Sequence, residues 1–334
     1  MSMSQREAES KSTGSTSELE VVERGEGWFK VQHRHRGNIC TIMDTFAEMF
    51  PMWACRVLIT ADGEKWASTA AQTATGFATS IIMSPAEAGV EGILPEEKTP
   101  DGRLGVLIQM YSRSRFELKS EMIKRLGQCV MTCPTTAVFD ALPKAKRRLR
   151  VGRSLRLFGD GFQKRDFLYG RRVWRIPVME GEFTVEETFG VVKAVAGGNL
   201  LILAENKQSG LKAAEEAVKA IKEAADKVIL PFPAGICRAG SKAGSLKYKL
   251  KASTNHPYCP TLKSVVDNTR LPSNVNCVYE IVIDGLTVDA VKKAMSVGIR
   301  AAADVSGVVM ISAGNYGGKL GPYKVFLRKL LELT

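Results

Sequence analysis

The chain contains the same short pattern twice, and this repetition restricts what it can fold into. Asp44-Thr45-Phe46 precedes the apolar run Val57 to Ala61, and Glu187-Thr188-Phe189 precedes, at the same spacing, the apolar run Leu200 to Ala204. Self-similarity over a long period indicates that one structural unit has been duplicated. A chain of 334 residues is also long enough to bury two compact cores. We therefore expect two similar units.

Each copy continues with the same order of segments: a helical pattern, a strand ending in Pro-Ala, another strand, another helix and a last strand. This β-α-β-β-α-β order predicts the fold class α+β, with two ferredoxin-like lobes that derive from an internal duplication. We place the lobes at residues 39–177 and 178–334. Residues 1–38 begin with a segment rich in Ser, Glu and Gly, which predicts a disordered N-terminal extension.

Periodicity places the individual elements. The helix of the second copy is the clearest, because its apolar residues recur at helical spacing while lysines face away. In the first lobe we expect strands at 56–61, 80–84, 106–111 and 129–132, and helices at 65–74 and 116–126. In the second lobe we expect strands at 200–204, 228–237, 278–283 and 308–312, and helices at 211–225 and 288–302.

Composition indicates an ordinary protein of a reducing compartment. The longest apolar stretch, Val191 to Ala204, is interrupted by Lys193 and by Gly197-Gly198, which argues against a membrane span. No apolar segment typical of a signal peptide occurs near the start, so we expect a cytoplasmic location. The seven cysteines mostly lie in or beside apolar runs and predict buried free thiols.

The net charge of +12 is concentrated in one segment, where Asp160 and Asp166 are the acids between Leu142 and Ile176. Its basic residues are Lys144, Lys146, Arg147, Arg148, Arg150, Arg153, Arg156, Lys164, Arg165, Arg171, Arg172 and Arg175. Such a segment attracts polyanions, either nucleic acid or small molecules with several acidic groups. A solvated basic connection between the lobes is the alternative interpretation.

Several common catalytic arrangements are missing. The segment 313–320 resembles a phosphate-binding loop but has Ala313 and Leu320 where Gly and Ser or Thr are required. His256 lies in a polar loop without a serine elbow, which favours an ordinary loop histidine over a catalytic base. Cys129 lacks a neighbouring base, and with Cys133 it makes an incomplete zinc site. We therefore expect no bound metal.

Glu280 breaks its local pattern. It shares a strand face with Val278 and Val282, within an otherwise apolar strand. A carboxyl in that position is either paired across the sheet or held in a low-polarity pocket with a raised pKa. The sequence alone leaves both outcomes open.

The sequence also resembles the formylmethanofuran:tetrahydromethanopterin formyltransferase family, in collinear order over roughly residues 40 to 325. The motifs that carry this resemblance are the segments 44–48, 75–80, 85–89, 127–132, 158–161, 196–199, 252–255, 279–283 and 312–321. The resemblance implies two ferredoxin-like lobes and a cytoplasmic enzyme of one-carbon metabolism in methanogenic or related archaea. It also implies a homotetramer, built as a dimer of dimers, that binds neither nucleic acid nor a membrane and has no prosthetic group or metal.

The implied reaction moves a formyl group reversibly from formylmethanofuran to N5 of tetrahydromethanopterin, the two coenzymes being co-substrates. The strand glutamate matching Glu280 is the implied catalytic group. Direct attack of N5 on the formyl carbon needs no serine or thiol nucleophile, but it gains from a donor to the developing oxyanion. Our hypothesis is that Glu280 works protonated, as such a donor. As substrate-binding residues we expect Phe77, Pro85, Ala86, Glu87, Gln128, Cys129, Gly197, Gly198, Asn199, Ser253, Thr254, Asn255, Tyr258, Asn315 and Tyr316.

Two other functions compete with this interpretation. A non-catalytic relative could serve as a subunit of a larger formyltransferase/hydrolase assembly, although such a subunit would not need a carboxyl at Glu280. RNA binding is possible for a ferredoxin-like sheet with positive charge, but the strands lack the aromatic pattern of RNA-binding sheets.

Overall fold

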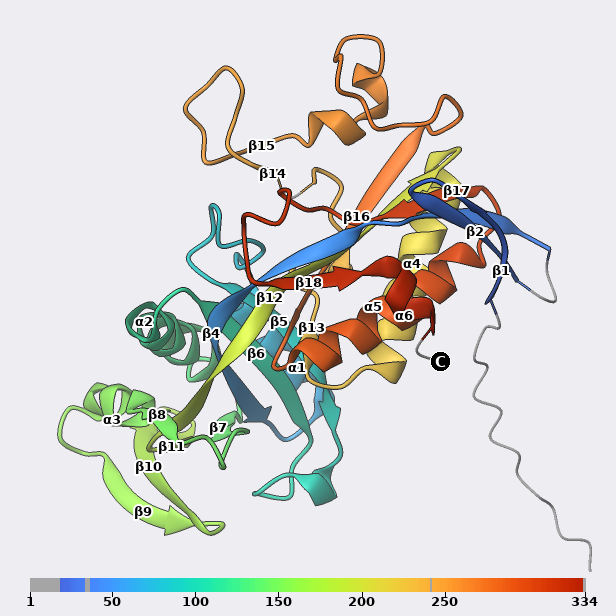
Figure 1. Ribbon diagram of the computed structural model, residues 1–334. Coiled ribbons are helices and arrows are strands. Elements are labelled where there is room, and N and C mark those ends of the chain that lie inside the picture. Colours follow the sequence, from blue (N-terminus) through green and yellow to red (C-terminus); the bar gives the residue numbers. More distant parts are fainter. Residues whose placement is uncertain (1–18, 34–36, 241, 333–334) are drawn as a thin grey trace, which may run out of the picture.

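The computed structural model describes residues 19–33, 37–240 and 242–332. Across these residues the chain has a mixed α+β fold in which sixteen strands join one continuous sheet. Two short strands, β14 (Lys242–Ala243) and β15 (Ala252–Ser253), pair separately. Figure 1 shows an N-terminal unit in blue to green beside a C-terminal unit in yellow to red. The predicted α+β class is confirmed.

The first unit contains the expected order of elements. They are β4 (Phe46–Thr60), α1 (Glu64–Thr75), β5 (Glu87–Leu94), β6 (Gly105–Ser112), α2 (Arg115–Arg125) and β7 (Ala137–Asp140). The strands lie side by side in the order β7-β4-β6-β5, each antiparallel to its neighbours. Helix α2 begins at a reciprocal capping box, in which Ser114 and Glu117 each accept a hydrogen bond from the other's backbone N–H.

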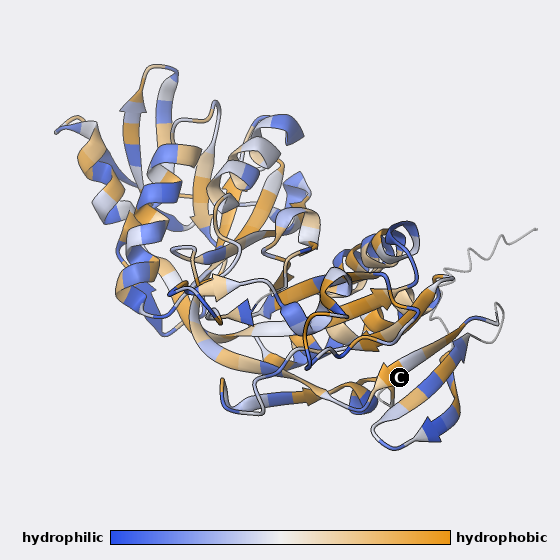
Figure 2. Ribbon diagram, turned by 90° about the horizontal axis from the view of Figure 1, so that it is seen from above, coloured by the Kyte–Doolittle hydropathy of each residue, from blue (hydrophilic) through white to orange (hydrophobic). Residues whose placement is uncertain are grey.

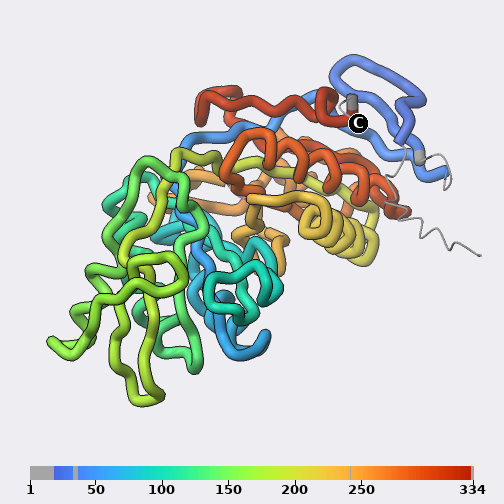
Figure 3. The backbone as a smooth tube through the Cα atoms, turned by 90° about the horizontal axis from the view of Figure 1, so that it is seen from below, coloured from blue at the N-terminus to red at the C-terminus, as the bar shows by residue number. Residues whose placement is uncertain are grey.

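The second unit repeats this arrangement. Its elements are β12 (Phe189–Ala204), α4 (Lys207–Ala224), β13 (Val228–Ile229), β16 (Cys277–Gly285), α5 (Val288–Ala303) and β17 (Val308–Ser312). The strands lie in the order β17-β12-β16-β13. Asn206 and Thr287 cap the first turns of α4 and α5. The two helices run side by side over the sheet (Figure 3) and bury their apolar faces in one core with β12 and β16.

Strands β4 and β12 join the two units. Their N-terminal halves pair antiparallel, from Phe50 opposite Ala196 to Cys55 opposite Val191. Their C-terminal halves pair with strands of their own unit. The sheet therefore passes without a break from one unit to the other, while each unit keeps its own main core beneath its helices. Figure 2 shows hydrophobic and hydrophilic residues alternating along these helices, as expected when one face is covered.

Three further segments extend the sheet. Residues 147–186, which we call the arm, project from the first unit (Figure 1). The arm contains β8 (Arg147–Leu149), α3 (Val151–Leu155), β9 (Lys164–Leu168), β10 (Arg171–Val178) and β11 (Gly181–Glu186). At the other end are β1 (Leu19–Gly25), β2 (Trp28–His33) and β3 (Ile39–Met43), and β3 pairs parallel with β17. The chain closes with β18 (Tyr323–Phe326), which pairs with β4, and α6 (Leu327–Glu332).

The expected disorder of residues 1–38 is wrong where the structure describes that segment. Residues 19–33 form the hairpin of β1 and β2, and β2 places Phe29 and Val31 in the core of the second unit. Residues 1–18 and 34–36 lie outside the described residues. The alternation of Phe29 and Val31 with polar residues is the signal of this half-buried strand.

Three predicted strands are also wrong. Residues 80–84 form a turn, in which the Ser84 N–H donates to the Ser80 carbonyl at 2.7 Å, and the strand begins only after Pro85. Residues 129–132 belong to the π-helix η2 (Leu126–Val130) and the turn after it, so the last strand of the first unit is β7. Of residues 228–237 only Val228 and Ile229 are strand, because Pro231 and Pro233 lead into a 3₁₀ turn.

All seven cysteines are free thiols, as predicted, and four of them are buried. Burial raises the pKa of Cys40 and of Cys55 to about 12. None of the helices in the described part of the chain has the length and apolar character that a membrane crossing requires.

Candidate active site

A cleft of about 860 Å³ lies where the two units meet. The turn 77–87 and Arg113 of the first unit form one side, and strands β12 and β16 with the loop 314–320 of the second unit form the other. Strand β4 contributes Glu48 and Phe50. The cleft therefore depends on both copies of the repeated unit.

Glu280 lies in the wall of this cleft. Glu280 is 3% exposed, and its Oε1 accepts a hydrogen bond from the Asn199 side-chain amide at 2.9 Å. Its backbone pairs with Cys237 on one side and with Leu201 of β12 on the other. Of the two outcomes left open by the sequence, the structure combines elements of both, since the carboxyl is buried at a cleft and accepts a hydrogen bond from the neutral amide of Asn199 across the sheet.

A β-bulge in β12 positions the groups around Glu280. The register between β12 and β16 shifts between Val195 and Gly198, and Gly197 has φ of +90°. A Cβ at Gly197 would approach the Phe50 ring to 2.9 Å, so only glycine fits without strain. The bulge directs the Gly197 N–H to Asp284 Oδ1 at 3.1 Å and the Asn199 amide to Glu280. One local irregularity thus provides both carboxyl groups with a donor.

Glu87 and Asp284 form a second acidic group at the cleft. Glu87 lines the cleft, and Asp284 lies behind it, fully buried in β16. Burial raises the pKa of Glu87, although hydrogen bonds and the Arg113 charge oppose this shift. Burial and the neighbouring Glu87 charge raise the pKa of Asp284 well above its ordinary value.

Glu48 holds the glycine-rich loop 314–321. Its carboxylate accepts hydrogen bonds from the backbone N–H groups of Tyr316 at 2.8 Å, Gly318 at 3.0 Å and Gly321 at 2.9 Å, and also from that of Leu320. Desolvation opposes the charged form, but these four donors lower the pKa of Glu48 below its ordinary value.

The backbone donors of this loop are used within the protein. The Gly314 N–H donates to the Asn199 side chain and the Tyr316 N–H to Glu48. The Asn315 side chain is directed to Thr45 and to the Phe46 carbonyl. Gly318 and Gly321 donate to the Glu48 carboxylate, and Tyr316 lines the cleft.

The structure brings together about half of the predicted site. Glu280, Phe77, Pro85, Glu87, Gly197, Asn199 and Tyr316 line the cleft. Ala86 and Gly198 are buried beside lining residues. The other predicted residues lie outside the lining: Gln128 and Cys129 in η2, Asn315 in the loop 314–321, and Ser253, Thr254, Asn255 and Tyr258 at or after β15. Their role in substrate binding remains a prediction.

Sequence reasoning missed Glu48, Arg113, Lys251 and Asp284. Asp284 had a usable signal, because it continues the strand face of Glu280 and Val282 at the same two-residue spacing. Glu48 belongs to the motif 44–48, but nothing in the sequence indicates that it binds a loop almost three hundred positions away.

Part of the basic segment is neutralised by acids from outside it. Arg148 and Arg171 pair with Glu186, Arg165 pairs with Glu187, and Arg175 pairs with Glu182. The sequence count ended at Ile176, before these acids, which lie in β11 or directly after it. Part of the charge therefore stabilises the arm.

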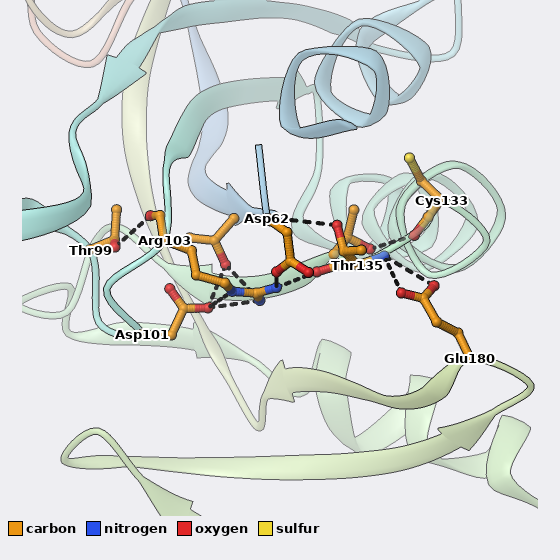
Figure 4. A network of polar contacts seen from close by, with 9 residues as sticks. Asp62, Thr99, Asp101, Arg103, Cys133, Thr135 and Glu180 are labelled. Atoms are coloured by element: carbon orange, nitrogen blue, oxygen red, sulfur yellow. Dashed lines mark hydrogen bonds and ion pairs between the residues drawn. The ribbon is translucent and has the colours of Figure 1, made fainter. Parts of the chain in front are cut away.

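A separate polar network joins the first unit to the arm (Figure 4). Arg103 pairs with Asp62 at 2.9 Å and Asp101 at 2.8 Å, and it also donates to the Thr135 carbonyl. Glu180 of the arm accepts from the Thr135 N–H with both oxygens. A cavity of about 190 Å³ adjoins this network, but no predicted site residue lines it. Across the described residues no three His, Cys, Asp or Glu side chains are grouped to hold a metal ion.

Comparison with known proteins places the chain among formyltransferases. A family model described as formylmethanofuran-tetrahydromethanopterin formyltransferase matches residues 36–178, and a model of the proximal lobe of the same family matches residues 181–330. The chain therefore belongs to the formylmethanofuran-tetrahydromethanopterin formyltransferase family.

Relatives of that name match over nearly their whole length. The protein of Methanocaldococcus jannaschii is 56% identical over 87% of this chain and 98% of its own, and that of Methanopyrus kandleri is 55% identical over 86% and 97%. The solved enzyme of Methanosarcina barkeri has a TM-score of 0.83 at 49% identity, covering 86% of this chain and 97% of its own. A structure of the formyltransferase/hydrolase complex of Methylorubrum extorquens with methylofuran has a TM-score of 0.83 at 44% identity, with coverage of 87% and 97%.

Proposed function

We propose that this protein transfers a formyl group reversibly from formylmethanofuran to N5 of tetrahydromethanopterin, in archaeal methanogenesis or its reversal. The observation that carries this proposal is the cleft of about 860 Å³ between the units, with Glu280 buried in its wall, in a member of this formyltransferase family. Its volume lies within the range of ordinary small-molecule sites.

In the proposed mechanism Glu280 is neutral. The N5 lone pair attacks the formyl carbon, and the carbonyl electrons move to the oxygen, where a protonated Glu280 donates a hydrogen bond. Asn199 supports this arrangement, because its side-chain amide donates to Glu280 Oε1 and holds the carboxyl in the cleft wall. Collapse of the tetrahedral species then breaks the bond from carbon to the methanofuran nitrogen. No covalent enzyme intermediate is formed.

The test compares Glu280→Gln with Glu280→Ala, assayed by the ultraviolet change on formation of the N5-formyl pterin. Glutamine keeps a donor, whereas alanine removes it and should lower kcat about 100-fold, or about 3 kcal/mol. We expect glutamine to retain much of the activity. Equal losses in both variants would contradict the neutral donor, and a formyl group trapped on a cysteine would contradict direct transfer.

We further propose that the two units are ferredoxin-like lobes from an internal duplication, divided near residues 177 and 178. The matching neighbour orders β7-β4-β6-β5 and β17-β12-β16-β13 support this proposal. We propose that the enzyme works in the cytoplasm, with the coenzymes as substrates, without a prosthetic group and without a nucleic-acid partner.

We also propose assembly as a homotetramer, a dimer of dimers. The arm carries large apolar side chains that are more than half exposed, which is typical of surfaces that bind protein. They are Leu157, Phe158, Phe162, Phe167, Tyr169 and Met179. The alternative is a subunit of a mixed complex, because the Methylorubrum relative was solved in a formyltransferase/hydrolase complex. Light scattering of the purified chain decides between them, since we expect a tetramer, and a monomer would contradict self-assembly.

A further inference from the structure

Glu87 and Asp284 come from different units and meet at the cleft. Glu87 begins β5 and is 4% exposed, whereas Asp284 lies in β16 and is 0% exposed. Each of the two carboxyl groups lies close enough to the other to shift its pKa. Asp284 lies on the same strand face as Glu280, so one strand brings both acidic groups to the cleft region.

Each carboxyl has one oxygen with a backbone donor and one without. Glu87 Oε1 accepts from the Ile81 N–H at 2.8 Å, and Asp284 Oδ1 accepts from the Gly197 N–H at 3.1 Å. Glu87 Oε2 and Asp284 Oδ2 are buried, and no donor among the described residues reaches them. Two ionised carboxylates would place acceptors against each other, whereas one proton between them forms an O–H···O bond that satisfies both.

The surroundings decide which residue holds that proton. Asp284 is the more deeply buried residue, and the Arg113 guanidinium favours the charged form of Glu87. Tyr111 of β6 also faces the pair, but its hydroxyl donates to Gln109, and burial and the nearby acids raise its pKa. Glu91 of β5 is compensated by Arg56. The proton therefore belongs on Asp284, and the charge belongs on Glu87, the member that lines the cleft.

We propose that Glu87 and Asp284 share one proton, and that Glu87 carries the proton that passes between the two substrate nitrogens. This inference rests on the proposed formyl transfer. Attack by N5 leaves that nitrogen with an extra proton, which the Glu87 carboxylate accepts while Asp284 keeps its own. When the carbon–nitrogen bond breaks, the methanofuran nitrogen takes the proton from Glu87, and the pair returns to its starting state with no net change.

In this scheme the two residues act differently. Glu87 lines the cleft and exchanges a proton with substrate, whereas Asp284 is a positioning residue that keeps Glu87 ionised by donating to it. Glu280 acts on the developing oxyanion. The bulge at Gly197 links the two tasks, because it orients Asp284 and, through Asn199, Glu280.

The experiment measures kcat against pH for four variants. Glu87→Gln can still bond to Asp284 but cannot carry a proton, and we expect kcat to fall about 100-fold. In Asp284→Asn the side-chain amide can still donate to Glu87, and kcat should stay within about tenfold of the wild-type value. Asp284→Val removes the donor, so Glu87 ionises at higher pH and the acid limb of the profile moves to higher pH. Glu186→Gln is the matched control, a buried carboxyl of the arm with a raised pKa and no place in the cleft.

An infrared measurement tests the shared proton without substrate. One band for the carbonyl stretch of a protonated carboxyl should be lost from both Glu87→Gln and Asp284→Asn, each of which replaces the acid pair by one carboxylate and one amide, and kept in Glu186→Gln, while the band of the protonated Glu280 stays in every variant. Spectra of both variants that keep all the protonated-carboxyl bands of the wild type would overturn the shared proton. A Glu87→Gln enzyme with wild-type kcat and pH profile would overturn proton transfer by Glu87. An inactive wild type would instead refute the proposed function, and the infrared result would still decide whether the pair shares a proton.

Discussion

Replacing Glu48 by glutamine tests how the loop 314–321 is held. The Glu48 carboxylate accepts hydrogen bonds from four backbone N–H groups, two on each oxygen: Leu320 and Gly321 at Oε1, and Tyr316 and Gly318 at Oε2. A glutamine carbonyl can take over one side, but its NH₂ group then faces the donors of the other side. Two charge-assisted hydrogen bonds are lost.

The expected cost follows from that count. A hydrogen bond to a charged group contributes about 1.5–3 kcal/mol, so losing two costs about 3 kcal/mol at the lower end. The lower end applies because the loop is largely exposed and water can replace part of the loss. The effect also depends on pH. Because folding lowers the Glu48 pKa below 4.5, its contribution is present above that value and is lost as the pH falls through the folded pKa.

The assay is urea unfolding combined with amide hydrogen exchange. We expect a lower midpoint at an unchanged slope, and faster exchange at the pair of donors that faces the new NH₂ group, either Tyr316 with Gly318 or Leu320 with Gly321. Glu223→Gln, an exposed carboxylate on α4, is the control and should leave both measurements unchanged. A loss below about 0.5 kcal/mol with unchanged exchange at all four amides would refute the reasoning.

Three other predictions concern the sheet and its acids. Gly197→Ala, at φ of +90° and 2.9 Å from the Phe50 ring, should cost about 1–3 kcal/mol and reduce activity, whereas Gly92→Ala, with open space around it, should change neither. Arg103→Met removes the cation that pairs with the buried Asp101 carboxylate and should lower the free energy of unfolding by about 3 kcal/mol. Calorimetry that shows no shift in Tm would contradict this value. Since folding raises the Asp284 pKa above 3.8, the stability it contributes is present below that pH and is lost as the pH rises through the folded pKa. When the free energy of unfolding is measured against pH, Asp284→Asn should remove this loss of stability.

The order of elements was predictable because it rests on apolar periodicity. The spacing in α4 and α5 marks buried faces, and both helices occur where that spacing placed them. The failures lie where local chemistry outweighs hydrophobicity. Residues 129–132 are apolar enough for a strand, but Val130 and Met131 continue the packing of a helix whose last turn widens to a π-helix. Residues 80–84 are apolar because they line a cleft rather than a core.

The site was predictable only in part, for a related reason. Glu280 was visible because a carboxyl is out of place in an apolar strand, and the structure gives it a cleft and an amide partner. The role of Glu48 was not found, because it depends on contacts with a loop near the other end of the chain, about which spacing within one segment carries no information. Asp284 has the same spacing signal as Glu280, but its neighbour Glu87 belongs to the other unit, and only the folded structure brings the two together.

The pairing of β4 with β12 has a local two-fold symmetry. The shift that carries Asp44 onto Glu187 also carries Trp53 onto Ala196 and Phe50 onto Lys193, and the sheet pairs Trp53 with Lys193 and Phe50 with Ala196. Each strand therefore meets the counterpart of itself, as two identical subunits do across an isologous interface. The single chain has the geometry of a dimer fused end to end, and separating its halves would expose two self-complementary edges that drive each half to find a second copy.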